Sequence, residues 1–221
     1  TVVASLGGLE VYSWVFSSYL LTSTVTVPLW GKLSDVYGRR RFYLLGIGLF
    51  LSGSVACGLS HSMTELILFR GWQGLGAGAV LALGLTIIGE IYPFEARARM
   101  QGLFSGVWGV ASILGPFLGG LLTDHLSWRW VFFVNVPIGA LAAFIIGRFL
   151  RDPEAERPRS AAVDALGGSV LTVTLVLLLL GVMGAGWTGL GRLALVAVAA
   201  VGLVVFGRIE RRKGGISHSP G

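Results

Sequence analysis

Residues 31–41 read GKLSDVYGRRR and join two long charge-free runs, Val11–Gly31 and Phe42–Thr64. Two glycines bracket Asp35, and three arginines follow the second glycine. Glycine permits a tight turn, and an aspartate can cap a helix or pair with a nearby arginine. The segment therefore predicts a short basic turn between two apolar helices.

Apolar runs of this kind recur along the whole chain. A helix needs about 20 mostly apolar residues to cross the hydrocarbon core of a bilayer. The predicted spans are Val11–Gly31, Phe42–Thr64, Gly71–Gly89, Met100–Thr123, Trp130–Gly147, Ala165–Gly191 and Leu193–Gly207. The last is the shortest, and Arg192 can extend it by placing its charge at the membrane surface. We therefore expect an all-α integral membrane protein, a bundle of seven transmembrane helices.

Composition supports this class and excludes others. Of the 221 residues, 54% are hydrophobic and only 13% are charged. Soluble domains carry about 25% charged residues, and disordered chains combine high charge with low hydrophobicity. Glycine occurs 34 times, and in spans it lets helix backbones approach closely, as at the spacing of Gly74 and Gly78. For these glycines we expect ordinary helix packing.

The basic residues set an orientation. Of the 17 Lys and Arg residues, 14 fall in segments on one side of the predicted membrane, and only Arg129 and Arg192 fall on the other. Such an excess marks the cytoplasmic side. We expect the chain in the cytoplasmic (plasma) membrane, with its N-terminus outside and its C-terminus inside. An outside N-terminus without a signal peptide is expected if another span precedes it.

Sites for catalysis or metal binding are not evident in the sequence. There is one cysteine, Cys57, and the histidines, His61, His125 and His218, are scattered. No paired acids or nucleophile–base set faces one membrane boundary. The arginine clusters occur one per loop, without a soluble domain to carry nucleic acid. We therefore expect no enzyme activity, no cofactor, no metal and no nucleic-acid partner.

Arg70 is the only charge well inside an apolar region. Burying a charge at the centre of a span costs about 2.5–3.5 kcal/mol on the insertion scale, which favours a functional role. Arg70 also lies only five residues past Glu65, so its side chain could instead reach the membrane surface. Gln73, at i+3, could hold the arginine or be satisfied elsewhere. The residues alone leave these alternatives open.

Four segments resemble conserved motifs of the major facilitator superfamily. Residues 31–41 resemble its motif A, and residues 70–78, RGWQGLGAG, resemble motif B. Residues 102–120 resemble motif C, the antiporter motif, with Ala111 where the family has glycine. Residues 127–139, SWRWVFFVNVPIG, resemble the start of span six in fourteen-span drug:proton antiporters. Because the motifs follow the family's order, the resemblance implies a partial major facilitator fold covering spans two to eight.

The resemblance also implies a division of the chain. The expected parts are the end of a first span with an outer loop (1–10), an N-terminal transporter half (11–150), a cytoplasmic linker (151–162), two extra spans (163–207) and a cytoplasmic tail or start of the C-terminal half (208–221). The first span and most of the C-terminal half are then expected outside this sequence. Residues 208–213 do not form a second motif-A-like loop, which favours the fourteen-span branch over the twelve-span one.

The function implied by the resemblance is a proton-coupled antiporter that exports amphipathic drugs or related small molecules. The implied site residues are Arg70 and Gln73 for proton coupling; Gly31, Asp35, Gly38, Arg39 and Arg40 for cytoplasmic gating; Gly102, Gly115, Pro116, Gly119 and Gly120 for the antiporter motif; and Trp108 and Asn135 for a possible substrate cavity. The expected partners are protons, an amphipathic small molecule, the lipid bilayer and the C-terminal half of the same protein. The proton-binding carboxylate is expected outside this chain.

A seven-helix receptor is the alternative, because seven spans with the N-terminus outside are its pattern. A retinal protein is excluded, since the only lysines, Lys32 and Lys213, lie in loops. A receptor also does not require the series of motifs. Among the remaining polar and aromatic residues, we expect Glu90 and Glu95 to be solvated loop residues and Trp128 to be an interfacial anchor.

Overall fold

The computed structural model describes residues 2–150, 173–181 and 189–214, and these residues form helices and no strand. The elements are α1 (Val2–Leu6), the 3-10 helix η1 (Leu9–Val11), α2 (Ser13–Tyr37), α3 (Arg39–Leu59), α4 (Met63–Ile91), α5 (Phe94–His125), α6 (Trp130–Phe133), α7 (Asn135–Phe149), a helix over 173–181 and α9 (Gly189–Gly214). The prediction of an all-α chain is confirmed for this part. The predicted linker, 151–162, lies outside the described residues.

Four helices in the described residues are long and apolar enough to cross a membrane. They are α3, α4, α5 and the segment Trp130–Phe149, which joins α6 and α7. α2 is 25 residues long and contains many Ser and Thr residues, and it is not among these four. The last predicted span is represented by the shorter apolar segment Gly189–Val205, and parts of Ala165–Gly191 lie outside the described residues. The structure therefore does not establish the predicted count of seven.

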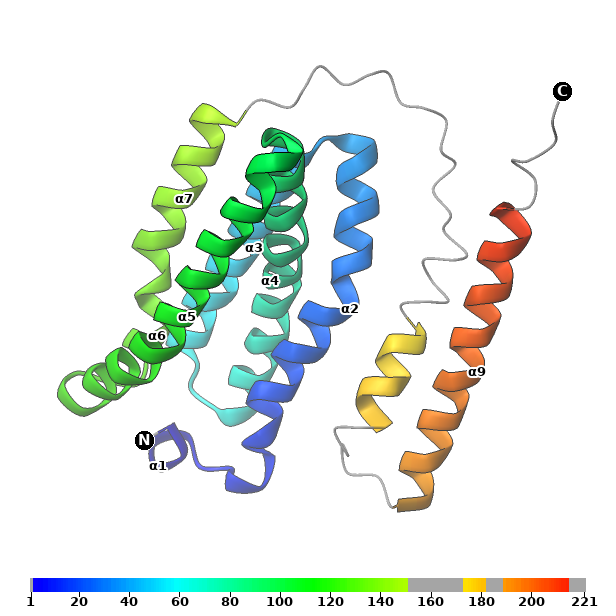
Figure 1. Cartoon of the computed structure of the whole chain (residues 1–221). Coiled ribbons are helices and arrows are strands. Elements are labelled where there is room, and N and C mark those ends of the chain that lie inside the picture. The colour runs from blue at the N-terminus through cyan, green and yellow to red at the C-terminus, as the bar shows by residue number, and fades with distance from the viewer. Residues whose placement is uncertain (1, 151–172, 182–188, 215–221) are drawn as a thin grey trace, which may run out of the picture.

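Helix α4 packs between α2 and α3, and its glycines make both contacts possible (Figure 1). A Cβ atom on Gly74 or Gly78 would collide with α2, where the nearest atoms belong to Thr22 and Thr26. A Cβ atom on Gly76 would collide with the α3 backbone at Phe50. The predicted packing role of the Gly74–Gly78 pair is confirmed. This close packing holds α4 in a fixed orientation relative to α2 and α3, and with it Gln73, which precedes Gly74 in the sequence.

The fifth predicted span, Trp130–Gly147, packs on α3. It is locally interrupted between α6 and α7 at Val134, where φ of −60° and ψ of −26° remain helical, so Trp130–Phe149 still forms one 20-residue apolar helix. Pro137 follows the interruption and cannot donate a backbone hydrogen bond to the preceding turn. On either side, Phe133 lies against Gly58 and Gly139 lies against Leu51. Both halves of the span are therefore held by α3.

Trp128 is buried, so the prediction of an interfacial anchor is wrong. It is 6% exposed and belongs to a hydrophobic cluster with Val15, Cys57, Met63 and Leu66. Its indole Nε1 donates to Ser5 Oγ at 2.9 Å, which satisfies the one polar atom of the ring. Sequence position placed this residue at the membrane boundary, but the packing of α1 over this end of the bundle covers it.

The basic segments that the structure describes lie together at one end of the bundle. The α2–α3 turn, the α4–α5 turn and the end of α7 share this end, whereas α1 lies at the opposite end (Figure 1). Arg40, at the start of α3, donates to the carbonyl of Gly147 near the end of α7. This contact joins α3 to α7 at the basic end of the bundle.

Candidate functional site

The guanidinium of Arg70 is bound inside the bundle. Its Nε donates to the carbonyl of Val15 on α2 at 3.2 Å, and its Nη1 donates to Gln73 Oε1 at 2.6 Å. The ring of Tyr19 lies 4.0 Å from the guanidinium carbon, and the ring of Phe132 lies 5.9 Å away. The side chain therefore contacts α2 as well as its own helix, α4.

The partners of this cation are neutral. Among the described residues, the ion pairs are those of Arg39 with Asp35 and Glu90, and neither involves Arg70. A carbonyl, an amide oxygen and aromatic faces stabilise the positive charge without cancelling it. A carboxylate brought close to Arg70 would therefore meet an uncompensated positive charge.

Gln73 connects Arg70 to a second set of polar groups. Gln73 is 1% exposed, and its Nε2 donates to Ser54 Oγ at 3.0 Å. Ser54 Oγ also accepts from Asn135 Nδ2 at 3.1 Å and donates to the carbonyl of Phe132 at 2.9 Å. The network spans α3, α4, α6 and α7, and the single cysteine, Cys57, borders it with its Sγ 3.9 Å from Gln73 Oε1.

Of the two roles that the sequence left open for Gln73, the structure supports the first, because Gln73 holds Arg70. Asn135, predicted as possible cavity lining, is bonded to Ser54, and its cavity role stays a prediction. Ser54 and Tyr19 were not anticipated from the sequence. Ser54 lies in the small-residue run SGSVACG, residues 52–58, where nothing distinguishes it from its neighbours.

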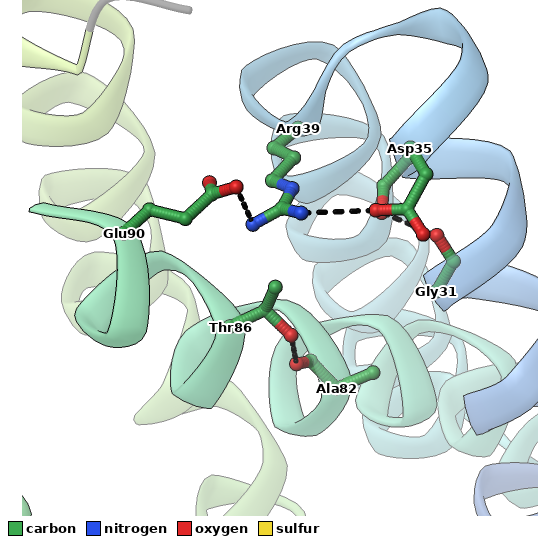
Figure 2. Close-up of polar contacts among 7 residues, drawn as sticks. Gly31, Asp35, Arg39, Ala82, Thr86 and Glu90 are labelled. Atoms are coloured by element: carbon green, nitrogen blue, oxygen red, sulfur yellow. Dashed lines mark hydrogen bonds and ion pairs between the residues drawn. The ribbon is translucent and has the colours of Figure 1, made fainter. Parts of the chain in front are cut away.

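The basic turn forms a second cluster of interacting residues. Gly38 has φ of 100°, a conformation that favours glycine, and it separates α2 from α3. Arg39, the first residue of α3, lies between two carboxylates, with its Nη2 3.0 Å from Asp35 Oδ1 and its Nη1 in contact with Glu90 Oε1 (Figure 2). Ser34 Oγ donates to the carbonyl of Gly31 at 2.7 Å, within the last two turns of α2.

Glu90 is the residue of this cluster that sequence reasoning missed. Glu90 is exposed, as predicted, but the prediction that it lies in a loop is wrong, because it lies in the last turn of α4 and pairs with Arg39. Its side chain is 41% exposed and that of Asp35 is 60% exposed, whereas that of Arg39 is 22% exposed. The arginine thus links the ends of α2 and α4 to the start of α3. Glu95 is exposed in the first turn of α5.

The predicted antiporter motif lies apart from both clusters. All of its residues are on α5, which has no buried residue. A Cβ atom on Gly102, Gly115, Gly119 or Gly120 would meet nothing within 4 Å. Trp108, on the same helix, is exposed. The close helix contact expected of this motif therefore stays a prediction.

The described residues contain no group of three or more His, Cys, Asp or Glu side chains that could hold a metal ion. One cluster holds a half-buried cation, and the other is an ion-paired turn. Neither arranges a nucleophile and a base for a covalent reaction.

Comparison with known proteins places the sequence of this chain in a family. The sequence profile of the Major Facilitator Superfamily matches residues 1–209. The chain belongs to the major facilitator superfamily. Members of this family are integral membrane transporters, in agreement with the apolar helices, and the predicted family is confirmed. A receptor has no support from the comparisons.

Among similar proteins are several whose names describe drug efflux. Multidrug resistance protein 3 of Bacillus subtilis (strain 168) is 41% identical over 215 residues, covering 96% of this chain and 42% of the relative. Multidrug transporter protein MdtP of the same organism is 38% identical, covering 96% of this chain and 39% of the relative. Efflux pump dotC of Dothistroma septosporum is 36% identical, covering 95% of this chain and 37% of the relative. The chain thus spans about two-fifths of the length of these relatives.

Proposed function

We propose that the polypeptide containing residues 1–221 is a proton-coupled antiporter that exports amphipathic small molecules across the plasma membrane. The observation that carries the proposal is Arg70, a cation held within an apolar bundle by neutral partners. The printed names of the similar proteins, which describe multidrug transport and efflux, support the substrate class.

The half-buried cation of Arg70 provides a physical basis for coupling. A positive charge within about 4–6 Å of a carboxyl group favours its ionised form. A carboxyl group that moves toward Arg70 would therefore release its proton, and one that moves away would take a proton up. None of the 11 Asp and Glu residues lies in a predicted span, so we assign the carboxyl group to a part of the polypeptide outside residues 1–221. The C-terminal half is the partner that would complete the pathway.

The ion-paired turn suits a cytoplasmic gate. Arg39 binds Asp35 and Glu90, so movement of α2 relative to α4 would require at least one of these contacts to change. Partly exposed ion pairs are each worth less than about 1 kcal/mol, a magnitude suited to a contact that opens and closes. The excess of basic residues at this end supports a cytoplasmic location, with the N-terminus outside.

The proposal is tested by transport in proteoliposomes that contain the whole polypeptide. With an acidic interior, wild-type protein should accumulate ethidium, an amphipathic cation. Arg70→Ala should reduce accumulation to that of protein-free liposomes, and Arg70→Lys should retain only part of it, because lysine keeps the charge but not the planar fork. Arg99→Ala, at an exposed position on α5, is the matched control. Equal accumulation by the Arg70→Ala and Arg99→Ala proteins would contradict the proposal.

A further inference from the structure

Ser54 occupies the centre of the polar network, and its hydroxyl group is fully used. A serine hydroxyl offers one proton and two lone pairs. The proton goes to the carbonyl of Phe132, and the lone pairs receive the amide groups of Gln73 and Asn135. Ser54 is fully buried, so water does not substitute for any of these partners from the surface. A buried polar group can hold its neighbours in fixed orientations only when all of its hydrogen bonds are made, as they are for Ser54.

The direction of these bonds determines how Gln73 faces Arg70. Because Ser54 gives its proton to Phe132, it can only accept from Gln73, so the amide nitrogen Nε2 faces Ser54. The amide oxygen Oε1 must then face the opposite way, toward Nη1 of Arg70. A reversed amide would place two donor groups against each other at the guanidinium. Ser54 therefore determines which atom of Gln73 meets the cation.

The same hydroxyl group ties Arg70 to the interrupted span. Phe132 and Asn135 lie on either side of the interruption at Val134, and both bond to Ser54. A change in the angle between α6 and α7 would move one or both of these groups relative to α3. The alignment of Gln73, and with it that of Arg70, would change too.

We propose that Ser54 is a positioning residue for Arg70, orienting Gln73 and linking the cation to the interruption between α6 and α7. The inference rests on the proposed function, since it assigns Ser54 a part in proton coupling. Within the described residues, the titratable groups that face Arg70 are Tyr19 from α2 and Cys57 from α3, and neither is a carboxyl group.

The test is the pH dependence of ethidium transport by the whole polypeptide. Ser54→Ala should lower the initial rate of gradient-driven transport roughly three- to tenfold, the effect of losing one neutral hydrogen bond in the coupled state. It should also raise the pH at which the transport rate is half-maximal, here called the pH midpoint. The reason is that a displaced Arg70 cation favours ionisation of the coupling carboxyl group less strongly. Exchange of ethidium without a pH gradient should stay within about twofold of wild type.

Ser52→Ala provides a matched control on the same helix. Ser52 is exposed, accepts from Trp72 Nε1 and takes no part in the network, so its variant should match wild type in rate and midpoint. Asn135→Ala should shift the midpoint in the same direction as Ser54→Ala. The double variant Ser54→Ala/Asn135→Ala should equal Ser54→Ala alone, because Asn135 acts through the serine hydroxyl.

The outcomes separate this inference from the proposed function. If Ser54→Ala has the midpoint and rate of Ser52→Ala while Arg70→Ala loses transport, the positioning role is wrong and the antiporter proposal stands. If Arg70→Ala also transports normally, the antiporter proposal itself is wrong. Should Ser54→Ala fail to accumulate in the membrane, Asn135→Ala decides, and an unchanged midpoint in that variant overturns the inference.

Discussion

Gly53→Ala should separate α3 from α4 and thereby disturb the site without changing any of its polar side chains. A Cβ atom on Gly53 would lie 2.6 Å from Gln73 Cα and 2.7 Å from its backbone nitrogen. Ordinary contact begins at 3.4 Å, so the two backbones must move apart by about 0.8 Å. The bond from Gln73 to Ser54, now 3.0 Å, would lengthen to about 3.8 Å if it followed this movement.

The expected cost follows from these distances. Overpacking of a well-packed contact costs about 1–3 kcal/mol, and loss of a hydrogen bond adds about 0.5–1.5 kcal/mol. Gly48→Ala is the matched control, because the same helix offers its Cβ atom open space. Replacing Gly48 by alanine should stabilise the protein by up to about 1 kcal/mol, because alanine has a higher helix propensity than glycine.

The assay is thermal unfolding of the two purified variants in the same detergent. At about 2–4 °C per kcal/mol for a protein of this size, the midpoint of Gly53→Ala should lie roughly 3–20 °C below that of Gly48→Ala. Gly53→Ala should also lower gradient-driven ethidium transport. Equal midpoints for the two variants would refute the account of tight α3–α4 packing.

Two further predictions concern the basic turn. Gly38→Ala should lower the unfolding midpoint by an amount equivalent to about 1–2 kcal/mol, because φ of 100° is unfavourable for alanine. Gly31→Ala is the control, because a Cβ atom at that position meets no neighbouring atom. An unchanged unfolding midpoint for Gly38→Ala would contradict the turn geometry. Glu90→Gln should change stability by less than about 1 kcal/mol but lower the initial transport rate severalfold, since it weakens the link between Arg39 and α4. Glu95→Gln, at an exposed position without an ion pair in the described residues, should leave the rate unchanged, and equal rates for the two glutamine variants would exclude a gating role for Glu90.

Much of the fold follows from local properties of the sequence. Long charge-free runs predicted the helices, because a run of that length can satisfy its backbone hydrogen bonds in lipid only as a helix or in a closed barrel. The glycine spacing around Gly74 predicted close packing, since the absence of a side chain has a direct steric effect. The motif order predicted the family. The interruption at Val134 was not predicted, because Pro137 permits a break without fixing where it occurs.

The candidate site was predicted less completely, for a physical reason. Arg70 and Gln73 share one helix face, so their contact could be expected from i,i+3 spacing. Ser54 and Glu90 reach the site from other helices, and their partners lie 19 and 51 positions away in the sequence, at Gln73 and Arg39. Nothing in the local sequence encodes such contacts. The burial of Trp128 was missed for the same reason, because it depends on how the distant residues near Ser5 pack.

The most direct test of the central claim is the proton movement that accompanies efflux. Proteoliposomes containing the whole polypeptide would be loaded with a pH-sensitive dye and an acidic interior, and ethidium would be added outside. The account predicts that ethidium entry raises the interior pH in wild-type liposomes and does not do so with Arg70→Ala. Ethidium entry at an unchanged interior pH in the wild type would contradict proton-coupled antiport.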